Sequence, residues 1–164
     1  MKKIGIVMGS DSDLPIIEKA TAILDEFNAP YEVHVYSAHR TPNEAHEFSK
    51  TAEEKGFGVL ICAAGMAAHL AGVVAASTTL PVIGIPCKGP VFDGMDALLA
   101  TVQMPSGIPV ATVAVNGGAN AALLAVEILA VGDIELSKKL KEKRESDNKK
   151  VLEKDKIVCA KFNA

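Results

Sequence analysis

The sequence is poor in aromatic residues, and that scarcity disfavours several kinds of ligand. It contains no tryptophan, and aromatic residues make up 4% of its 164 positions. A flavin ring is usually held between aromatic side chains, so a flavin-dependent electron carrier is disfavoured. The formal net charge is −3, which gives no electrostatic attraction for nucleic acid. Apolar residues still reach 49%, and they must therefore build an aliphatic, alanine-rich core.

Cysteine pairs and metal-binding spacings are also absent from the sequence. Cys62, Cys87 and Cys159 are odd in number and widely spaced, and no Cys-x-x-Cys or His-x-x-x-His pairing accompanies them. We expect no metal site, and we expect Cys62, inside an apolar run, to be a small buried hydrophobe. No apolar run is long enough for a bilayer, and Met1 leads directly into a predicted strand without a signal peptide. A cytoplasmic protein without a membrane partner is therefore expected.

Short apolar runs alternate with amphipathic segments along most of the chain. Strands are predicted at 3–8, 31–36, 58–63, 81–85 and 110–115, and helices at 13–27, 42–55, 67–77, 93–101 and 118–131. This alternation predicts an α/β fold, a three-layer αβα sandwich around a parallel sheet. The third strand is apolar throughout, as a central strand is, whereas the second alternates like an edge strand. A flavodoxin-like strand order of 2-1-3-4-5 follows, with a ligand crevice between strands one and three.

The most informative loop, Ser37–Pro42, follows the second predicted strand. The residues Thr41–Glu44 have the spacing of a capping box and predict that a helix starts there. His39 and Arg40 then lie at the carboxyl end of a strand, where open α/β sheets bind ligands. Arginine binds phosphate or carboxylate, and histidine exchanges a proton near neutral pH. An exposed loop without a function is the alternative.

The first predicted strand ends in a second candidate loop, Gly9–Asp13. A turn rich in glycine and serine before a helix binds anions, because free backbone N–H groups and the helix dipole converge there. Ser10 and Ser12 add hydroxyl donors, and Asp13 can accept hydrogen bonds from sugar hydroxyls. The alternative is that Ser12 or Asp13 only caps the helix. The turn lacks the dinucleotide glycine pattern and the Walker ending, so it favours a mononucleotide over NAD or ATP.

Several segments together resemble the 5-(carboxyamino)imidazole ribonucleotide mutase family of purine biosynthesis. The matching segments are Val7–Asp13, Ser37–Pro42, Ala67–Leu70, Gln103–Pro109 and Ala119–Ala125. The resemblance covers nearly the whole chain, from Lys3 to about Leu152. It implies an isomerase that moves a carboxylate from the exocyclic nitrogen of an aminoimidazole ribonucleotide to ring carbon four. The implied route is decarboxylation, trapping of carbon dioxide, attack by the ring carbon and loss of its proton.

That route needs one group that donates and then accepts a proton, and we assign His39 to it. We expect Arg40 with Ser10 to hold the phosphate of the ribonucleotide substrate and Asp13 to hold the ribose. The predicted substrate-binding residues are, in full, Ser10, Ser12, Asp13, Ser37, Arg40, Gly65 and His69. No cofactor is expected, since the carboxylate arrives already attached and the sequence shows no site for a metal, ATP or biotin.

The loop that opens the third predicted helix contains Gly65, Met66 and His69. The resemblance implies that this loop walls the pocket where carbon dioxide is released and recaptured. Many family members carry Gly-Gly there, and this chain departs from them with Gly65-Met66. A single histidine in an apolar helix is more often structural, so His69 is the weaker catalytic candidate.

Two rival functions compete with the isomerase. Relatives that carboxylate aminoimidazole ribonucleotide directly with free carbon dioxide typically have lysine in place of Arg40 and lack Pro42. The segment Ser37–Pro42 therefore favours the mutase, and the direct carboxylase is the alternative. A phosphoacceptor signalling module needs a carboxylate after the third strand, where this chain has Ala63–Gly65 instead.

The composition changes sharply at residue 133. Sixteen of the 24 residues from 133 to 156 are charged, and the apolar residues among them form only a thin stripe. One interpretation is a solvated terminal helix supported by charge pairs. We favour a helix that extends across a neighbouring subunit, because the resemblance implies compact octamers. The predicted division is a catalytic region 1–132 and a C-terminal helix and tail 133–164, both within one domain of a homo-octamer.

Overall fold

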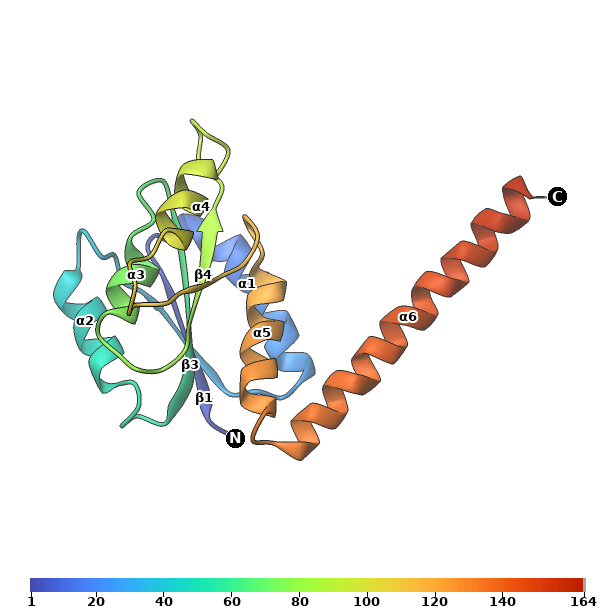
Figure 1. Ribbon diagram of the computed structural model, residues 1–164, viewed down its shortest axis with the longest axis horizontal. Helices are drawn as coiled ribbons and strands as arrows, with labels where there is room; N and C mark the ends of the chain where they lie inside the picture. Colours follow the sequence, from blue (N-terminus) through green and yellow to red (C-terminus); the bar gives the residue numbers. More distant parts are fainter. Residues whose placement is uncertain (164) are drawn as a thin grey trace.

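The computed structural model, which describes residues 1–163, is built around a five-stranded parallel sheet (Figure 1). Its strands are β1 (Lys3–Met8), β2 (Tyr31–Val35), β3 (Phe57–Gly65), β4 (Val82–Cys87) and β5 (Ala111–Thr112). Their order is β2-β1-β3-β4-β5, and every neighbouring pair is parallel. The predicted fold class and strand order are confirmed.

Helices cover both faces of this sheet and enclose two apolar layers. On one face lie α1 (Leu14–Glu26) and α5 (Gly118–Ala130), and on the other lie α2 (Pro42–Thr51) and α3 (Leu70–Ala75) (Figure 1). The short helix α4 (Met95–Val102) follows β4. Because β3 is central and covered on both faces, most of its residues are fully buried, Cys62 among them at 1% exposure.

Several element boundaries differ from those predicted. β5 has only two residues rather than six, because the chain leaves the sheet for a turn in which Asn116 has a positive φ of 58°. α3 begins at Leu70 rather than at 67, since residues 66–69 form tight turns in which Ala68 N–H bonds to the Met66 carbonyl at 2.8 Å. A 3₁₀ turn, η1 (Asp11–Asp13), precedes α1.

The predicted helix caps were wrong in detail. Thr41 Oγ1 does not cap α2 and Glu44 does not reach back; the Thr41 hydroxyl instead accepts from Ser37 N–H at 2.8 Å. At the other loop neither Ser12 nor Asp13 supplies the capping oxygen. Ser10 Oγ accepts from Ser12 N–H at 3.3 Å and caps η1. In both loops a serine or threonine hydroxyl bonds to its own turn, which competes with capping.

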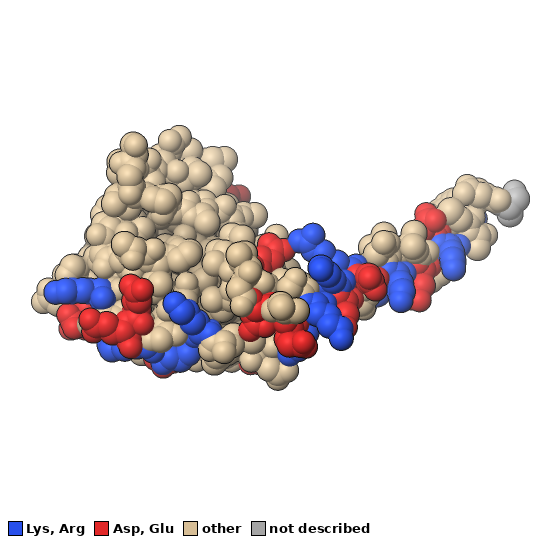
Figure 2. Space-filling view, turned by 60° about the horizontal axis from the view of Figure 1, so that its bottom comes forward, with Lys and Arg blue, Asp and Glu red and all other residues tan. Residues whose placement is uncertain are grey.

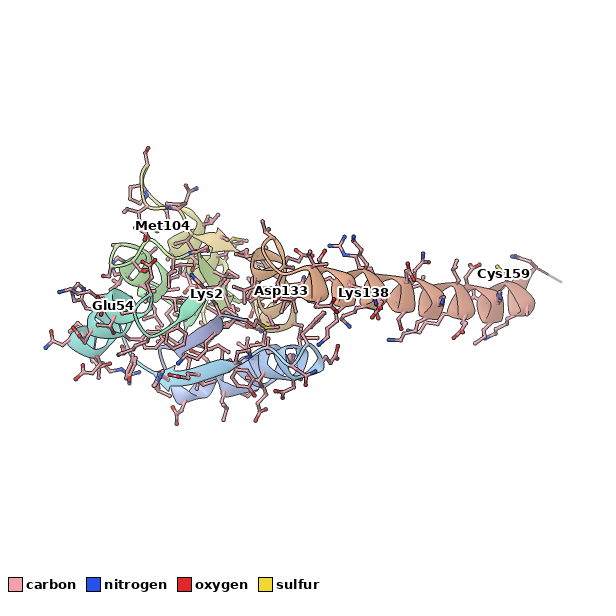
Figure 3. All side chains as sticks on the ribbon, turned by 90° about the horizontal axis from the view of Figure 1, so that it is seen from below. Lys2, Glu54, Met104, Asp133, Lys138 and Cys159 are labelled. Atoms are coloured by element: carbon pink, nitrogen blue, oxygen red, sulfur yellow. The ribbon has the colours of Figure 1, made fainter. Side chains whose placement is uncertain are left out.

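The long helix α6 (Ile134–Phe162) starts on the body of the protein and then leaves it (Figures 1 and 3). Asp133 caps its first turn by accepting from Leu136 N–H at 3.0 Å, and Leu136 is 1% exposed. Lys143 pairs with Glu26 of α1 at 3.2 Å. The C-terminal part carries exposed apolar side chains, including Val151 and Phe162.

Within residues 1–163, no helix has both the length and the apolar character to cross a membrane. Residue 164, the end of the predicted tail, lies outside the described residues.

The close approach of α1 and α5 is testable at a glycine. A Cβ added at Gly118 would lie 2.2 Å from the Ile16 carbonyl oxygen, whereas one added at Gly132 would have no heavy atom within 4 Å. We expect Gly118→Ala to lower the free energy of unfolding by about 1–3 kcal/mol through overpacking against the backbone. Gly132→Ala is the matched control and is expected to leave stability unchanged or raise it by about 0.4–1 kcal/mol. Urea denaturation of both variants measures the difference; equal stabilities would contradict the tight packing of Gly118 against Ile16.

Candidate active site

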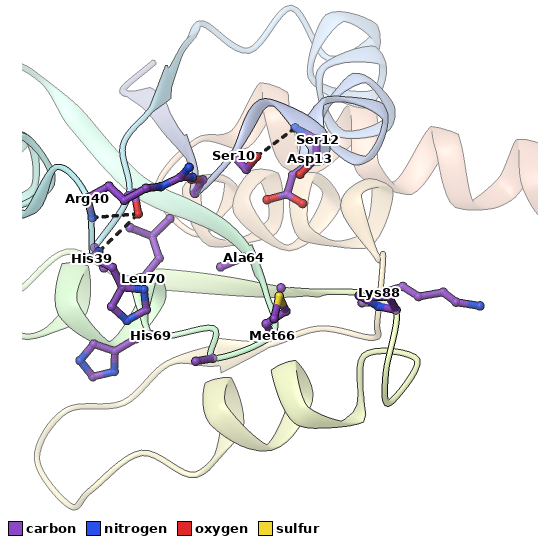
Figure 4. Close-up of a pocket in the computed structure, with 17 residues that line it drawn as sticks. Ser10, Ser12, Asp13, His39, Arg40, Ala64, Met66, His69, Leu70 and Lys88 are labelled. Carbon is purple, nitrogen blue, oxygen red and sulfur yellow. Dashed lines mark hydrogen bonds between the residues drawn. The ribbon is translucent and has the colours of Figure 1, made fainter.

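The loops that follow the first four strands surround one pocket of about 540 Å³ at the carboxyl edge of the sheet (Figure 4). All eight predicted site residues line it: Ser10, Ser12, Asp13, Ser37, His39, Arg40, Gly65 and His69. Three separate loops thus bring the predicted residues together, as the carboxyl ends of parallel strands do. The individual roles of these residues stay predictions.

The loop after β1 is held in place by bonds to β3 and within its own turn. Gly9 N–H bonds to the Ala63 carbonyl at 3.0 Å, which extends the β1–β3 ladder to the edge of the pocket. Ser10 Oγ accepts from Ser12 N–H and donates to Asp11 Oδ1 at 3.2 Å. The turn that places Ser10, Ser12 and Asp13 on the pocket is therefore fixed before any ligand arrives.

Asp13 is the least exposed ionisable side chain of the pocket, at 9% exposure. Burial raises the pKa of its carboxyl group, and a hydrogen bond from the Cys87 thiol partly offsets that rise. The pKa of Cys87 is itself raised to about 12 by burial and by the nearby Asp13 charge. Cys87 is therefore a neutral thiol close to the Asp13 carboxylate, and it donates to the Ile85 carbonyl at 3.6 Å.

The loop after β2 is folded around Ser37. Ser37 Oγ accepts from His39 N–H at 3.3 Å and from Arg40 N–H at 3.2 Å. These bonds orient the His39 and Arg40 side chains, so in the free protein the Ser37 hydroxyl organises the turn. Arg40 Nη2 donates to the Gly9 carbonyl at 2.9 Å and joins the two loops across the sheet edge. A guanidinium has five N–H donors, so others remain for an anion.

The two histidines of the pocket lie face to face. The His39 and His69 ring centroids are 6.2 Å apart and the ring planes differ by 16°. They come from different loops, one after β2 and one after β3, and both side chains are exposed to the pocket. This pairing joins the two histidines that the sequence left as separate candidates, and it places His69 beside the predicted proton-transfer group.

The loop after β4 supplies pocket residues that sequence reasoning missed, namely Lys88, Gly89 and Pro90. Lys88 Nζ pairs with Asp93 Oδ1 at 3.0 Å, and its backbone N–H donates to Asn116 Oδ1 at 2.9 Å. The fourth strand was predicted to end at residue 85, but β4 ends at Cys87, so Lys88 directly follows it at the same sheet edge as the other loops. Among residues 1–163, no three His, Cys, Asp or Glu side chains gather closely enough to share a metal ion.

Comparison with known proteins places this pocket in a family. The profile of the AIR carboxylase family matches residues 3–150. The chain belongs to the AIR carboxylase family. One curated relative, the N5-carboxyaminoimidazole ribonucleotide mutase of Pyrococcus abyssi, is 56% identical over 145 residues, which are 88% of this chain and 83% of that protein. The match therefore spans most of both chains.

A second kind of relative is much longer than this chain. The phosphoribosylaminoimidazole carboxylase of Saccharomyces cerevisiae is 51% identical over 139 residues, which are 85% of this chain but 24% of the yeast protein. Among solved structures, PurE of Treponema denticola superimposes with a TM-score of 0.81 at 32% identity and covers 94% of this chain and 97% of that one. The AIR carboxylase family fold is thus shared along almost the whole chain.

The buried carboxylate of Asp13 is expected to lower the stability of the folded protein near neutral pH. Its pKa is raised in the folded protein, so the stability that it contributes is present below the ordinary value of 3.8 and is lost as pH rises through the folded pKa. Asp13→Asn removes the buried charge, and we expect its melting temperature near neutral pH to rise by about 2–4 °C, the scale set by roughly 1 kcal/mol in a chain of this size.

Thermal melts of Asp13→Asn and the parent protein across acidic to neutral pH measure this effect. The gain is expected to shrink as pH falls toward 3.8. Asp11→Asn, an exposed carboxylate in the same turn, is the matched control and is expected to change stability by no more than about 0.5 kcal/mol. A pH-independent difference between Asp13→Asn and the parent would show that the buried charge is not its cause.

Proposed function

We propose that the chain is an N5-carboxyaminoimidazole ribonucleotide mutase of purine biosynthesis. The observation that carries this proposal is full-length similarity to proteins of that name. Besides the Pyrococcus abyssi relative, three further mutases are 51–54% identical over at least 92% of this chain and at least 86% of their own lengths. The carboxylases of similar identity are much longer proteins in which this chain matches about a quarter.

The two ends of the pocket suit the two ends of such a nucleotide. Ser10, Ser12 and Ser37 with the Arg40 guanidinium form a polar end that offers charge-assisted hydrogen bonds to a phosphate. Asp13 lies beside them, and its carboxylate accepts hydrogen bonds from the ribose hydroxyls. The substrate is thereby oriented with its imidazole ring toward the two histidines and the loop at Gly65. These contacts are the predicted ones, and the convergence of the three loops supports them.

The reaction then needs one proton carrier near the ring. As the bond between the exocyclic nitrogen and the carboxylate breaks, carbon dioxide leaves and the nitrogen takes a proton from the His39 imidazolium. Ring carbon four next attacks carbon dioxide and forms the new carbon–carbon bond. The proton on that carbon returns to the neutral imidazole of His39, so atoms and charge balance over the cycle. The ring of His69 lies nearly parallel to that of His39, with the two centroids 6.2 Å apart.

Direct carboxylation of aminoimidazole ribonucleotide by free carbon dioxide is the alternative. It would use the same pocket and only the second half of the reaction. Supplying each substrate separately, and following the ultraviolet absorbance of the product, distinguishes the two. We expect rapid turnover of the N-carboxylated nucleotide without added bicarbonate; turnover of only the uncarboxylated nucleotide would establish the direct carboxylase.

Mutation of His39 is expected to lower the reaction rate, whereas mutation of Arg40 is expected mainly to weaken nucleotide binding. His39→Asn keeps a similar shape but cannot transfer a proton, so we expect kcat to fall at least about 100-fold with little change in nucleotide affinity. Arg40→Ala is expected to weaken nucleotide binding by about 2 kcal/mol. Some loss of kcat accompanies it, because Arg40 also joins two loops of the pocket.

Calorimetric titration with the nucleotide, beside single-turnover rates, separates binding from chemistry in these two variants. If His39→Asn turns over normally, or fails only because it no longer binds nucleotide, the assignment of His39 is wrong. His69 is then the next candidate, since its ring stacks on that of His39.

Assembly into a homo-octamer is the second part of the proposal. Charged side chains gather along α6 and along one edge of the body, and a broad face beside them carries few (Figure 2). The exposed large apolar residues at α4 and the loop before it are Val91, Phe92, Met95, Leu99 and Val102. An apolar group of this kind next to a pocket is typical of a subunit interface. The cytoplasmic location stays a prediction.

Two truncations separate the folding role of α6 from its role in assembly. Light scattering of the full chain is expected to give about eight times the 17.2 kDa subunit mass, because a closed homo-octamer contains eight copies. Ending the chain after Gly132 removes buried Leu136, and we expect lower stability, by about 1.5–3 kcal/mol, together with weaker assembly. Ending it after Lys150 removes no buried residue from the described part of the chain and is expected to weaken assembly alone. A fully active monomer would refute the octamer.

A further inference from the structure

A second hollow, the β2–α2 groove, lies between the edge strand and the helix that covers it. It has a volume of about 510 Å³ and shares no lining residue with the pocket described above. The long helix α6 leaves the body at the end of the molecule opposite α2, so it does not cover this groove (Figures 1 and 3). The volume is in the range of small-molecule sites, about 300–1,000 Å³. The lining residues are Glu32, His34, Tyr36, Asn43, Glu44, Glu47, Phe48 and Lys55.

Three rings form the floor of the β2–α2 groove. His34 and Tyr36 are stacked, with their centroids 5.0 Å apart and their planes 8° apart. Phe48 of α2 is tilted against both of them, at 59° and 57°. Phe48 lies close to the sheet because Gly5 has no side chain there: a Cβ at Gly5 would lie 2.8 Å from Phe48 Cζ. Packing against the sheet therefore holds the ring cluster in place.

Burial in the core accounts for only one of these three rings. Phe48 is 6% exposed, whereas the His34 side chain is 33% exposed and Tyr36 is half-buried. Within residues 1–163, the lysine side chains that lie over aromatic rings do so at Phe57 and Phe162, and none lies over Tyr36 or Phe48. The protein's own cations therefore leave the rings of this groove uncovered.

Carboxylates stand on both sides of the groove. Glu32 belongs to β2, and its charge is paired with Lys3 at 2.5 Å. Glu44 and Glu47 are exposed on α2, and within residues 1–163 neither has a cationic partner within 4.0 Å. Lys55 alone is basic among the lining residues that the structure describes. The groove therefore combines an aromatic floor with an excess of negative charge.

We propose that the β2–α2 groove binds a polyamine, a linear cation in which ammonium groups alternate with short methylene chains. Glu44 and Glu47 lie one helical turn apart on the same side of α2, so two ammonium groups of one molecule pair with them. The methylenes between these groups lie on the aromatic floor, and the rings attract the adjacent positive charge through cation–π interaction. A hydrated metal ion gains no apolar contact with the rings, and the carboxylates repel an anion. This site is separate from the proposed mutase reaction.

Calorimetric titration of the full chain with spermidine tests this proposal. At low ionic strength, where screening is weak, we expect saturable binding with a single class of site per subunit. The double variant Glu44→Gln/Glu47→Gln keeps the side-chain shapes and removes both charges. Its dissociation constant is expected to rise about tenfold, the scale of two surface ion pairs. Lys55→Gln removes the competing cation and is expected to tighten binding about twofold.

Two variants of Tyr36 test the contribution of the rings. Tyr36→Leu keeps an apolar side chain without the ring, and we expect the dissociation constant for spermidine to rise about threefold, the scale of one exposed cation–π contact. Tyr36→Phe keeps the ring and is expected to bind as the parent protein does. Titration with magnesium chloride is the matched probe, since a metal ion senses the carboxylates without the rings. Tyr36→Leu is expected to leave any magnesium affinity unchanged, and circular dichroism verifies folding of each variant.

Glu54→Gln is the control for non-specific attraction, because Glu54 is an exposed carboxylate just beyond α2 that does not line the groove. It is expected to bind spermidine as the parent protein does. The absence of saturable binding by the parent, or equal weakening by Glu54→Gln and the double variant, would overturn the proposal. Equal affinities of Tyr36→Leu and Tyr36→Phe would do so as well. If Glu44→Gln/Glu47→Gln instead lowers the mass seen by light scattering, the groove is a contact between copies of the chain and the polyamine site is refuted.

Discussion

The parallel direction of all five strands is the constraint on which the rest of the structure depends. Parallel strands end at one edge of the sheet, so every loop that follows a strand begins there. β1 lies between β2 and β3, and the chain reverses its direction of winding at β1. The loops after these strands therefore meet at one place, which is where the pocket is found. Helices must cover both faces, because buried parallel strands leave no face for water.

Several polar groups of the pocket form hydrogen bonds that hold its loops in place in the free protein. The Ser37 hydroxyl organises its turn, and the Arg40 guanidinium joins that turn to the Gly9 carbonyl. A site fixed in this way requires little reorganisation when substrate binds, which favours a reaction that depends on positioning. At Asp13, burial disfavours the negative charge that the proposed contact with the ribose uses, so this residue lowers the stability of the folded protein near neutral pH.

Particular residues explain where prediction from sequence succeeded and where it was wrong. The continuous apolar run of β3 predicted a central strand because both of its faces are buried. The caps at Thr41 and Asp13 were mispredicted, since a hydroxyl bonds to whichever N–H the folded turn presents, and spacing alone does not identify it. Lys88 was missed although its position after β4 follows the rule that identified His39.

The sequence by itself determined the parallel α/β fold, the strand order and the three loops that carry the candidate residues, because periodicity and motif spacing are local properties of the chain. Only the tertiary structure decided which of those residues face one another. The His39–His69 stacking and the bond from Arg40 to Gly9 each join residues from two loops, and the Cys87 thiol at the end of β4 lies close to Asp13 in η1. Such contacts depend on how far each loop bends over the sheet edge, and that geometry is set by packing between distant segments.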